Sequence, residues 1–144
     1  MKKKNPIIFF FIFFVLNFSN SANAYSSDPK EFISEILIEA KKILVESNSK
    51  EFKAKGLSSI ALKTVDIKGI GFYTLGKYRK NLTDEQKKEY STLFEKYFLK
   101  SFTSRLTDYS DPKIEVNSVE VINAKYTIVK SVLLATDKRP EVKI

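Results

Sequence analysis

The strongest constraint on the fold is a long amphipathic helix, which the sequence predicts between residues 84 and 109. Thr83-Asp84-Glu85-Gln86 has the T-x-x-Q spacing of a capping box, in which two side chains satisfy backbone N–H groups at a helix start. At 1.5 Å per residue the helix would be roughly 39 Å long. Its apolar stripe consists of Tyr90, Leu93, Phe94, Tyr97, Phe98, Phe102, Leu106 and Tyr109. Helical periodicity fits both a packed core and the wall of an apolar cavity.

The first 24 residues have the three parts of an export signal. Lys2-Lys3-Lys4 is followed by an apolar run, Ile7 to Leu16, and by Ala22-Asn23-Ala24, the small-x-small pattern that signal peptidase accepts. Because the run is far shorter than the ~20 residues that span a bilayer, we expect cleavage after Ala24. We expect residues 25–144 to form one domain. An exported chain without cysteine fits a bacterial periplasm better than a disulfide-rich extracellular scaffold.

Two helices are predicted before residue 64. Asp28-Pro29-Lys30-Glu31 begins the first, with Asp28 as N-cap and Glu31 reaching back to the cap. The apolar period of this helix continues to about Glu46. Residues 50–63 have a weaker helical pattern, which Gly56 is expected to interrupt.

A third, short helix is expected between Asp66, its N-cap, and Gly76, its C-terminal stop. Gly69 and Gly71 lie inside it, where each glycine costs about 1 kcal/mol relative to alanine. Glycines that are kept in a helix despite this cost indicate that a neighbouring element or a ligand approaches the helix closely.

After residue 112 the spacing of apolar residues changes from the helical period to the strand period of two residues. Apolar residues alternate from Ile114 and again from Val119, with a slip at Ser118 that predicts a β-bulge. A second strand is predicted over residues 126–134 and the beginning of a third over 141–144. The fold class is therefore α+β with an antiparallel sheet. Because the sequence ends inside the third strand, we expect an incomplete sheet that lacks C-terminal strands.

The missing residue types exclude most enzymatic sites. Without histidine or cysteine, the chain has no Ser-His-Asp or Cys-His nucleophile and no thiolate or imidazole metal ligand. Carboxylates remain at Asp84-Glu85 and at Asp108 and Asp111, where helix ends give each of them a structural role. We therefore expect no catalytic residue, no metal site and no cofactor.

A basic turn joins the short helix to the long one. Lys77, Arg79 and Lys80 lie in it, and the chain has a formal net charge of +8. Two interpretations remain open, a solvated surface and a contact with a partner or with anionic lipid headgroups. Nucleic acid is not expected as a partner, because an export signal is predicted and the rings of the long helix lie on a core face rather than between the basic residues.

The stretch from Val65 to Ser110 resembles the MlaC or toluene-tolerance family of periplasmic phospholipid carriers. Two departures are Arg79, where the family usually has tryptophan, and the absence of the C-terminal strands with their Gly-Trp and Gly-x-Ser stretches. The matching features are Asp66, Leu75-Gly76, Tyr78, the capping box at Thr83, the rings Tyr90, Phe94, Phe98 and Phe102, and Arg105-Leu106-x-x-Tyr109.

The resemblance implies a helical layer packed on a curved antiparallel sheet that encloses a hydrophobic pocket for acyl chains. It implies a carrier, not an enzyme, that moves phospholipid between an outer-membrane lipoprotein complex and an inner-membrane ABC lipid transport complex, in support of outer-membrane lipid asymmetry. The basic turn, Lys77, Arg79 and Lys80, is then a partner or headgroup contact. We expect the pocket to be lined by Ile70, Tyr73, Phe94, Phe98, Phe102, Tyr126 and Ile128.

Two alternatives stay open. The first is a carrier of another hydrophobic lipid, such as a hopanoid-like molecule. The second is a carboxylate-based enzyme on a similar cone-shaped α+β fold. Identification of the lipid that co-purifies with the protein tests the first alternative, and an assay for turnover tests the second.

Overall fold

The computed structural model describes residues 24–46, 49–135 and 140–143, and over these residues helices precede a three-stranded antiparallel sheet of order β1-β2-β3. The fold class is α+β, as predicted. None of the helices in the described residues is long and apolar enough to cross a membrane. The elements are α2 (Pro29–Glu46), α3 (Lys50–Thr64), α4 (Ile67–Thr74), the 3-10 helix η1 (Gly76–Asn81), α5 (Asp84–Leu106), β1 (Ile114–Asn123), β2 (Tyr126–Leu133) and β3 (Val142–Lys143).

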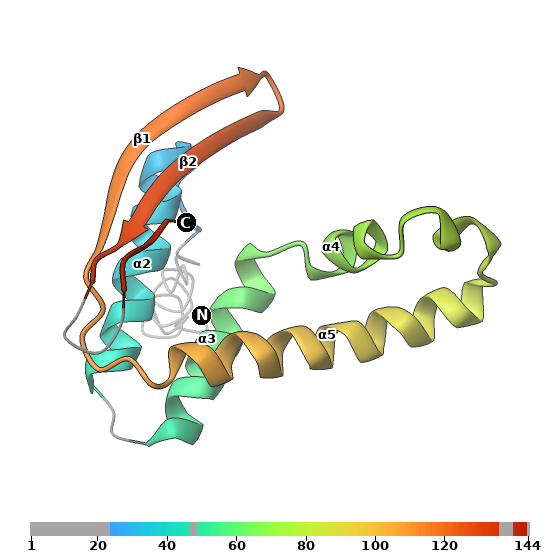
Figure 1. Ribbon diagram of the computed structural model, residues 1–144, viewed down its shortest axis with the longest axis horizontal. Helices are drawn as coiled ribbons and strands as arrows, with labels where there is room; N and C mark the ends of the chain where they lie inside the picture. Colours follow the sequence, from blue (N-terminus) through green and yellow to red (C-terminus); the bar gives the residue numbers. More distant parts are fainter. Residues whose placement is uncertain (1–23, 47–48, 136–139, 144) are drawn as a thin grey trace, which may run out of the picture.

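The elements extend in two directions from a junction around α3 (Figure 1). The β1–β2 hairpin runs along α2, which contacts both strands. Helices α4 and α5 contact each other and extend away from the hairpin as a two-helix arm, with η1 at its far end. The sheet is open, and the hairpin and the arm diverge (Figure 1).

The buried core is small and lies where the helices meet the base of the hairpin. Leu57 on α3 is 1% exposed and is the most deeply buried large side chain among the described residues. The core also contains Leu44, Ile60, Ala61, Ile67 and Leu133.

Helix α3 is continuous through Gly56, so the predicted interruption at this residue is wrong. A Cβ atom at Gly56 would lie 2.9 Å from Cδ1 of Ile43 on α2. The glycine therefore serves the close packing of α2 on α3 and does not break the helix.

The hairpin contains the predicted bulge. Val116 pairs with Ser131 and Ser118 pairs with Lys130, so the register shifts across Asn117. The bulge adds one residue to β1. The alternation restarts at Val119, and its apolar side chains therefore lie on the same face of the sheet as Val116. The third strand is confirmed at Val142–Lys143, which pairs with β2. Residues 136–139, between β2 and β3, and residue 144 of the predicted third strand lie outside the described residues.

The predicted start of α2 and the predicted end of α5 differ in detail from the structure. Asp28 caps α2 as predicted, because its Oδ1 accepts hydrogen bonds from the backbone N–H groups of Lys30 and Glu31, both at 2.9 Å. Glu31 does not reach back to the N-cap. Its carboxylate accepts a hydrogen bond from the Ser26 hydroxyl at 2.8 Å, and that hydroxyl accepts one from the Asp28 N–H at 3.1 Å.

Helix α5 ends at Leu106, three residues before the predicted end at Tyr109. The chain turns there towards the buried Pro112. Ion pairs hold this turn to the preceding helices, with Lys50 2.9 Å from Asp108 and Lys41 3.0 Å from Asp111. Tyr109 is half-buried in this turn, outside the helix, so the apolar pattern continues beyond the helix end.

The residues before α2 fold back along this helix. The Tyr25 hydroxyl donates a hydrogen bond to Glu39, and the Ser26 N–H donates one to Glu35 at 2.8 Å. The Tyr25 ring contacts Phe32 edge-on, with 5.6 Å between centroids. The hydrogen bond to Glu39, with burial and the charges of Glu39 and Glu35, raises the pKa of Tyr25 to about 12.

This raised pKa predicts a pH-dependent contribution to stability. The Tyr25 proton is bound more tightly in the folded state, so the contribution is complete below the ordinary pKa of 10.0 and disappears as the pH rises towards about 12. We expect Tyr25→Phe to be less stable than the wild type at neutral pH, and the two stabilities to converge above pH 12. Urea unfolding across this range measures the difference, and a constant difference would contradict the assignment.

Candidate functional site

The rings on α5 form a continuous stack along one side of the helix. Tyr90, Phe94, Phe98 and Phe102 recur every four residues, so each side chain lies one turn above the last. Successive centroids are 5.8, 6.3 and 5.9 Å apart, at interplanar angles of 26°, 29° and 10°. Phe72 of α4 continues the stack, 6.4 Å from Tyr90. These five half-buried rings are named the aromatic ladder.

Helix α4 lies against the ladder at Gly71, which is buried. A Cβ atom at this position would lie 2.8 Å from Cδ1 of Phe94. The hydroxyl groups of Tyr90 and Thr74 are 2.9 Å apart, and each lies within hydrogen-bonding distance of the Gly71 carbonyl oxygen, at 3.2 and 2.7 Å. Close approach of a neighbouring element at Gly71 is therefore confirmed, and a polar contact fixes it.

Gly69 has a different local role. Its N–H donates a hydrogen bond to Oδ1 of Asp66 at 2.9 Å, which confirms Asp66 as the N-cap of α4. A Cβ atom at Gly69 would lie 2.1 Å from the other carboxylate oxygen of Asp66. Gly69 therefore makes room for the cap of its own helix and not for a neighbouring element.

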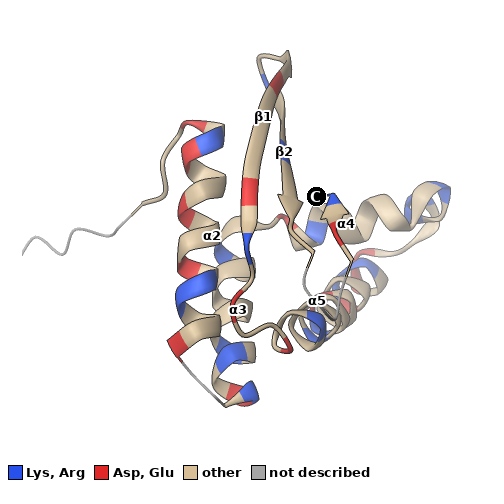
Figure 2. Ribbon diagram, turned by 60° about the vertical axis from the view of Figure 1, so that its left-hand side comes forward, with Lys and Arg blue, Asp and Glu red and all other residues tan. Residues whose placement is uncertain are grey.

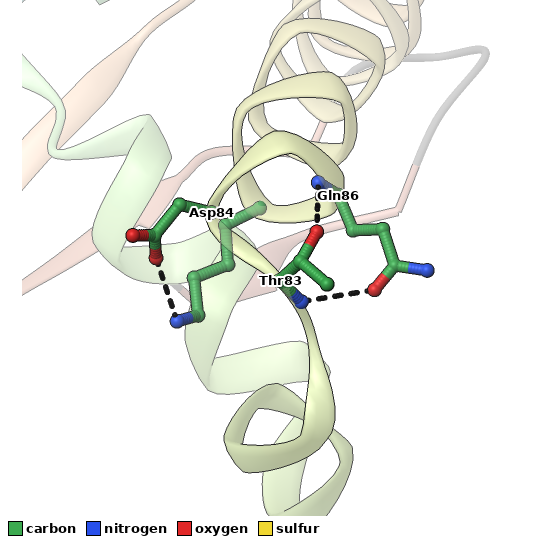
Figure 3. A network of polar contacts seen from close by, with 4 residues as sticks. Thr83, Asp84 and Gln86 are labelled. Atoms are coloured by element: carbon green, nitrogen blue, oxygen red, sulfur yellow. Dashed lines mark hydrogen bonds and ion pairs between the residues drawn. The ribbon is translucent and has the colours of Figure 1, made fainter.

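The predicted capping box orients the start of α5. The Thr83 N–H donates to Oε1 of Gln86 at 2.9 Å, and the Gln86 N–H donates to Oγ1 of Thr83 at 3.2 Å (Figure 3). Asp84 forms an ion pair with Lys87 at 3.1 Å in the same turn (Figure 3). The box satisfies backbone donors at the helix start, and so it helps to position the first rings of the ladder.

The predicted pocket residues fall into three groups in the structure. Phe94, Phe98 and Phe102 lie together in the ladder. Ile70 and Tyr73 lie on α4 and are 41% and 80% exposed. Tyr126 and Ile128 belong to β2, in the hairpin that diverges from the arm (Figure 1). The ladder brings three of the seven residues together, and a shared pocket for all seven remains a prediction.

The apolar stripe of α5 is narrower than predicted. Leu93 and Tyr97 were expected in it, but they are 57% and 70% exposed. Each precedes a ladder residue by one position, which places it about 100° around the helix from that ring. The contacts with α3 and α4 leave these two flanking positions in solvent.

Sequence reasoning missed Phe72 and the polar contact of Thr74 with Tyr90. Phe72 follows Gly71, the residue at which the sequence predicted a close approach. A ring beside such a glycine is a natural neighbour for the approaching element, and this signal could have placed Phe72 against the first ring of α5.

The candidate carboxylates have structural partners. Asp108 and Asp111 hold the turn after α5, and Asp84 pairs with Lys87. Hydrogen bonds from its own backbone N–H and from the Thr83 side chain lower the pKa of Glu85, which favours the ionised form at a helix N-terminus. Over the described residues, no group of three or more acidic, histidine or cysteine side chains is placed to hold a metal ion.

The basic turn forms η1 at the far end of the arm. Gly76 has a φ of +52° there, a left-handed conformation that ends α4 as predicted. Lys77, Arg79 and Lys80 follow it, and all three are exposed. This turn connects α4 to α5. The contact between these two helices forms the outer end of the ladder.

These features define a small α+β protein with a ring-lined helix face, the class of surface that accepts apolar ligands. A family model described as MlaC protein matches residues 34–144. The chain therefore belongs to the MlaC family, whose members are lipid-binding components of periplasmic lipid transport and have ABC transport systems as partners. No match was found among curated proteins or among solved structures.

We predict that Gly71 and Phe94 are energetically coupled. Gly71→Ala inserts a methyl group 2.8 Å from the Phe94 ring and should destabilise the contact of α4 with α5. Phe94→Leu makes room for that methyl group. Chemical denaturation of both single variants and the double variant should give a coupling free energy of about 0.5–3 kcal/mol, and strictly additive effects would contradict the contact.

Proposed function

We propose that this protein is a periplasmic carrier that holds the acyl chains of a phospholipid against the aromatic ladder. It would shuttle lipid between an outer-membrane lipoprotein complex and an inner-membrane ABC lipid transport complex. The observation that carries the proposal is the ladder, a continuous apolar surface of five half-buried rings. Membership of the MlaC family supports lipid as the ligand.

The length of the ladder suits one acyl chain. From Tyr90 to Phe102 the α5 backbone rises roughly 18 Å at 1.5 Å per residue. One leaflet of a bilayer holds its acyl chains within about half of the ~30 Å hydrocarbon core, or roughly 15 Å. A chain laid along the four rings would therefore contact apolar surface over most of its length.

The energetics favour a carrier that needs a partner for release. If both acyl chains of the lipid were fully buried, one on the ladder and one on the surfaces beyond it, roughly 30 methylene groups would leave water at about 0.8 kcal/mol each, a gross gain near 24 kcal/mol. This exceeds the practical ceiling of non-covalent affinity, so the ordering of lipid and protein must offset part of it. Spontaneous release remains slow, and the partner complexes would lower the barrier.

The remaining predicted residues would extend the site beyond the ladder. Ile70 and Tyr73 offer exposed apolar surface on α4, next to the first rings. Tyr126 and Ile128 offer a second surface on β2. We propose that they contact the parts of the lipid that lie beyond the four rings of α5.

A change at the centre of the ladder should reduce lipid binding. Phe98→Gln places a polar group between two rings, and we expect it to retain several-fold less lipid than the wild type, measured by mass spectrometry of the purified full chain. The matched control is Phe52→Gln, at a phenylalanine that is 57% exposed on α3.

Phe98→Leu keeps the surface apolar and should retain its lipid even if Phe98→Gln unfolds. Circular dichroism checks the fold of each variant. Equal lipid in folded Phe98→Gln and wild type would contradict the proposed site, and the identity of the recovered lipid separates phospholipid from a hopanoid-like ligand.

We also propose that residues 1–24 are a signal peptide and that the mature domain is 25–144. Expression in a Gram-negative host should give a periplasmic protein whose N-terminal sequence begins Tyr25-Ser26-Ser27. A bulky residue in Ala24→Leu should block processing. Recovery of membrane-bound wild type that begins at Met1 would contradict cleavage.

A further inference from the structure

We infer that the far end of the arm is a contact surface for anionic phospholipid bilayers, an inference that rests on the carrier function proposed above. The surface, named the basic tip, consists of Lys77, Tyr78, Arg79 and Lys80 on η1. It would place the outer end of the aromatic ladder beside the membrane from which lipid enters or to which lipid leaves.

The first observation is an excess of unpaired positive charge. The six residues of η1, Gly76–Asn81, contain three basic side chains and no acidic one, and all three are exposed. Among the described residues, none of the ion pairs involves these three side chains. Figure 2 shows basic residues at the far end of the arm, beyond α4.

The second observation is that apolar rings lie among these charges. Tyr78 is 65% exposed and Tyr73 is 80% exposed, although both are large side chains that a core could bury. Nζ of Lys77 lies 5.6 Å from the Tyr78 ring centroid. Tyrosine with flanking lysine or arginine is the composition that settles at a membrane–water interface, where the ring meets the headgroups and the cation meets phosphate.

The shape of the tip favours a bilayer surface over a protein partner. The tip projects at the end of the arm (Figure 1) and carries its charges on one short 3-10 turn. A projecting turn with dispersed charges can meet a flat anionic surface without a complementary groove, whereas a specific protein contact depends on a packed, fully desolvated centre.

The position of the tip connects this contact to the lipid site. Gly76 ends α4 only two residues after Thr74, whose hydroxyl lies 2.9 Å from that of the ladder residue Tyr90. A bilayer that contacts η1 would therefore lie next to the first rings of the ladder. Lipid exchange would then need only a short path between headgroup region and ladder.

The test is binding of the full chain to vesicles of phosphatidylcholine with and without phosphatidylglycerol, measured by co-sedimentation. We expect binding only when phosphatidylglycerol is present, and weaker binding at high salt. The triple variant Lys77→Gln, Arg79→Gln, Lys80→Gln should bind about a hundredfold more weakly, since each cation near an anionic surface contributes about a factor of five. Tyr78→Ser, which keeps the charge, should bind several-fold more weakly.

The matched control neutralises three exposed lysines away from the tip, in Lys55→Gln, Lys96→Gln, Lys125→Gln. This variant has the same net charge as the tip variant and should bind as the wild type does. Equal loss in both triple variants would overturn the inference, because binding would then depend on net charge alone. It would also be overturned if the tip variant bound vesicles normally but transferred lipid poorly to membranes that contain the partner complexes.

Lipid content separates this inference from the carrier function. The tip variant should keep its co-purified lipid, since it leaves all five rings in place. Wild-type protein that carries lipid but does not bind anionic vesicles overturns the membrane contact alone. Wild-type protein that binds vesicles but carries no lipid overturns the proposed function, and with it the reason for the contact.

Discussion

The contact between α4 and α5 at Gly71 is the interaction on which the arm depends. Helix α4 has eight residues, too few to be stable alone in water. Its position therefore depends on the buried glycine against Phe94 and on the Tyr90 and Thr74 hydroxyls around the Gly71 carbonyl. The same contact adds Phe72 to the ladder and holds η1 at the end of the arm.

The small core explains why apolar surface remains for a ligand. Buried side chains gather around α3 and the base of the hairpin, and the ladder extends from this junction along the arm. Rings that a larger domain would cover completely are only half-buried here. For the proposed carrier such a surface favours a lipid chain as its cover, because burial of methylene groups is favourable on both sides of the contact.

Features that depend on neighbouring residues could be predicted from the sequence, and features that depend on tertiary contacts could not. Asp28, Asp66 and Thr83 cap their helices because side chain and backbone donor lie within three residues of each other. The interruption at Gly56 was wrong because Ile43 of another helix uses the space. The sequence placed Leu93 and Tyr97 in the apolar stripe of α5, but both are exposed. Periodicity does not show how wide a face of α5 the neighbouring helices cover.

The central claim, that acyl chains lie along the ladder, can be tested by fluorescence, because the chain has no tryptophan. Phe98→Trp introduces a single reporter at the centre of the ladder, and Phe52→Trp introduces one at an exposed site on α3. Phospholipid brominated in its acyl chains quenches tryptophan on contact. The account predicts strong quenching of Phe98→Trp and little quenching of Phe52→Trp. Equal quenching of both variants would contradict it, and so would the absence of quenching in Phe98→Trp when lipid is bound.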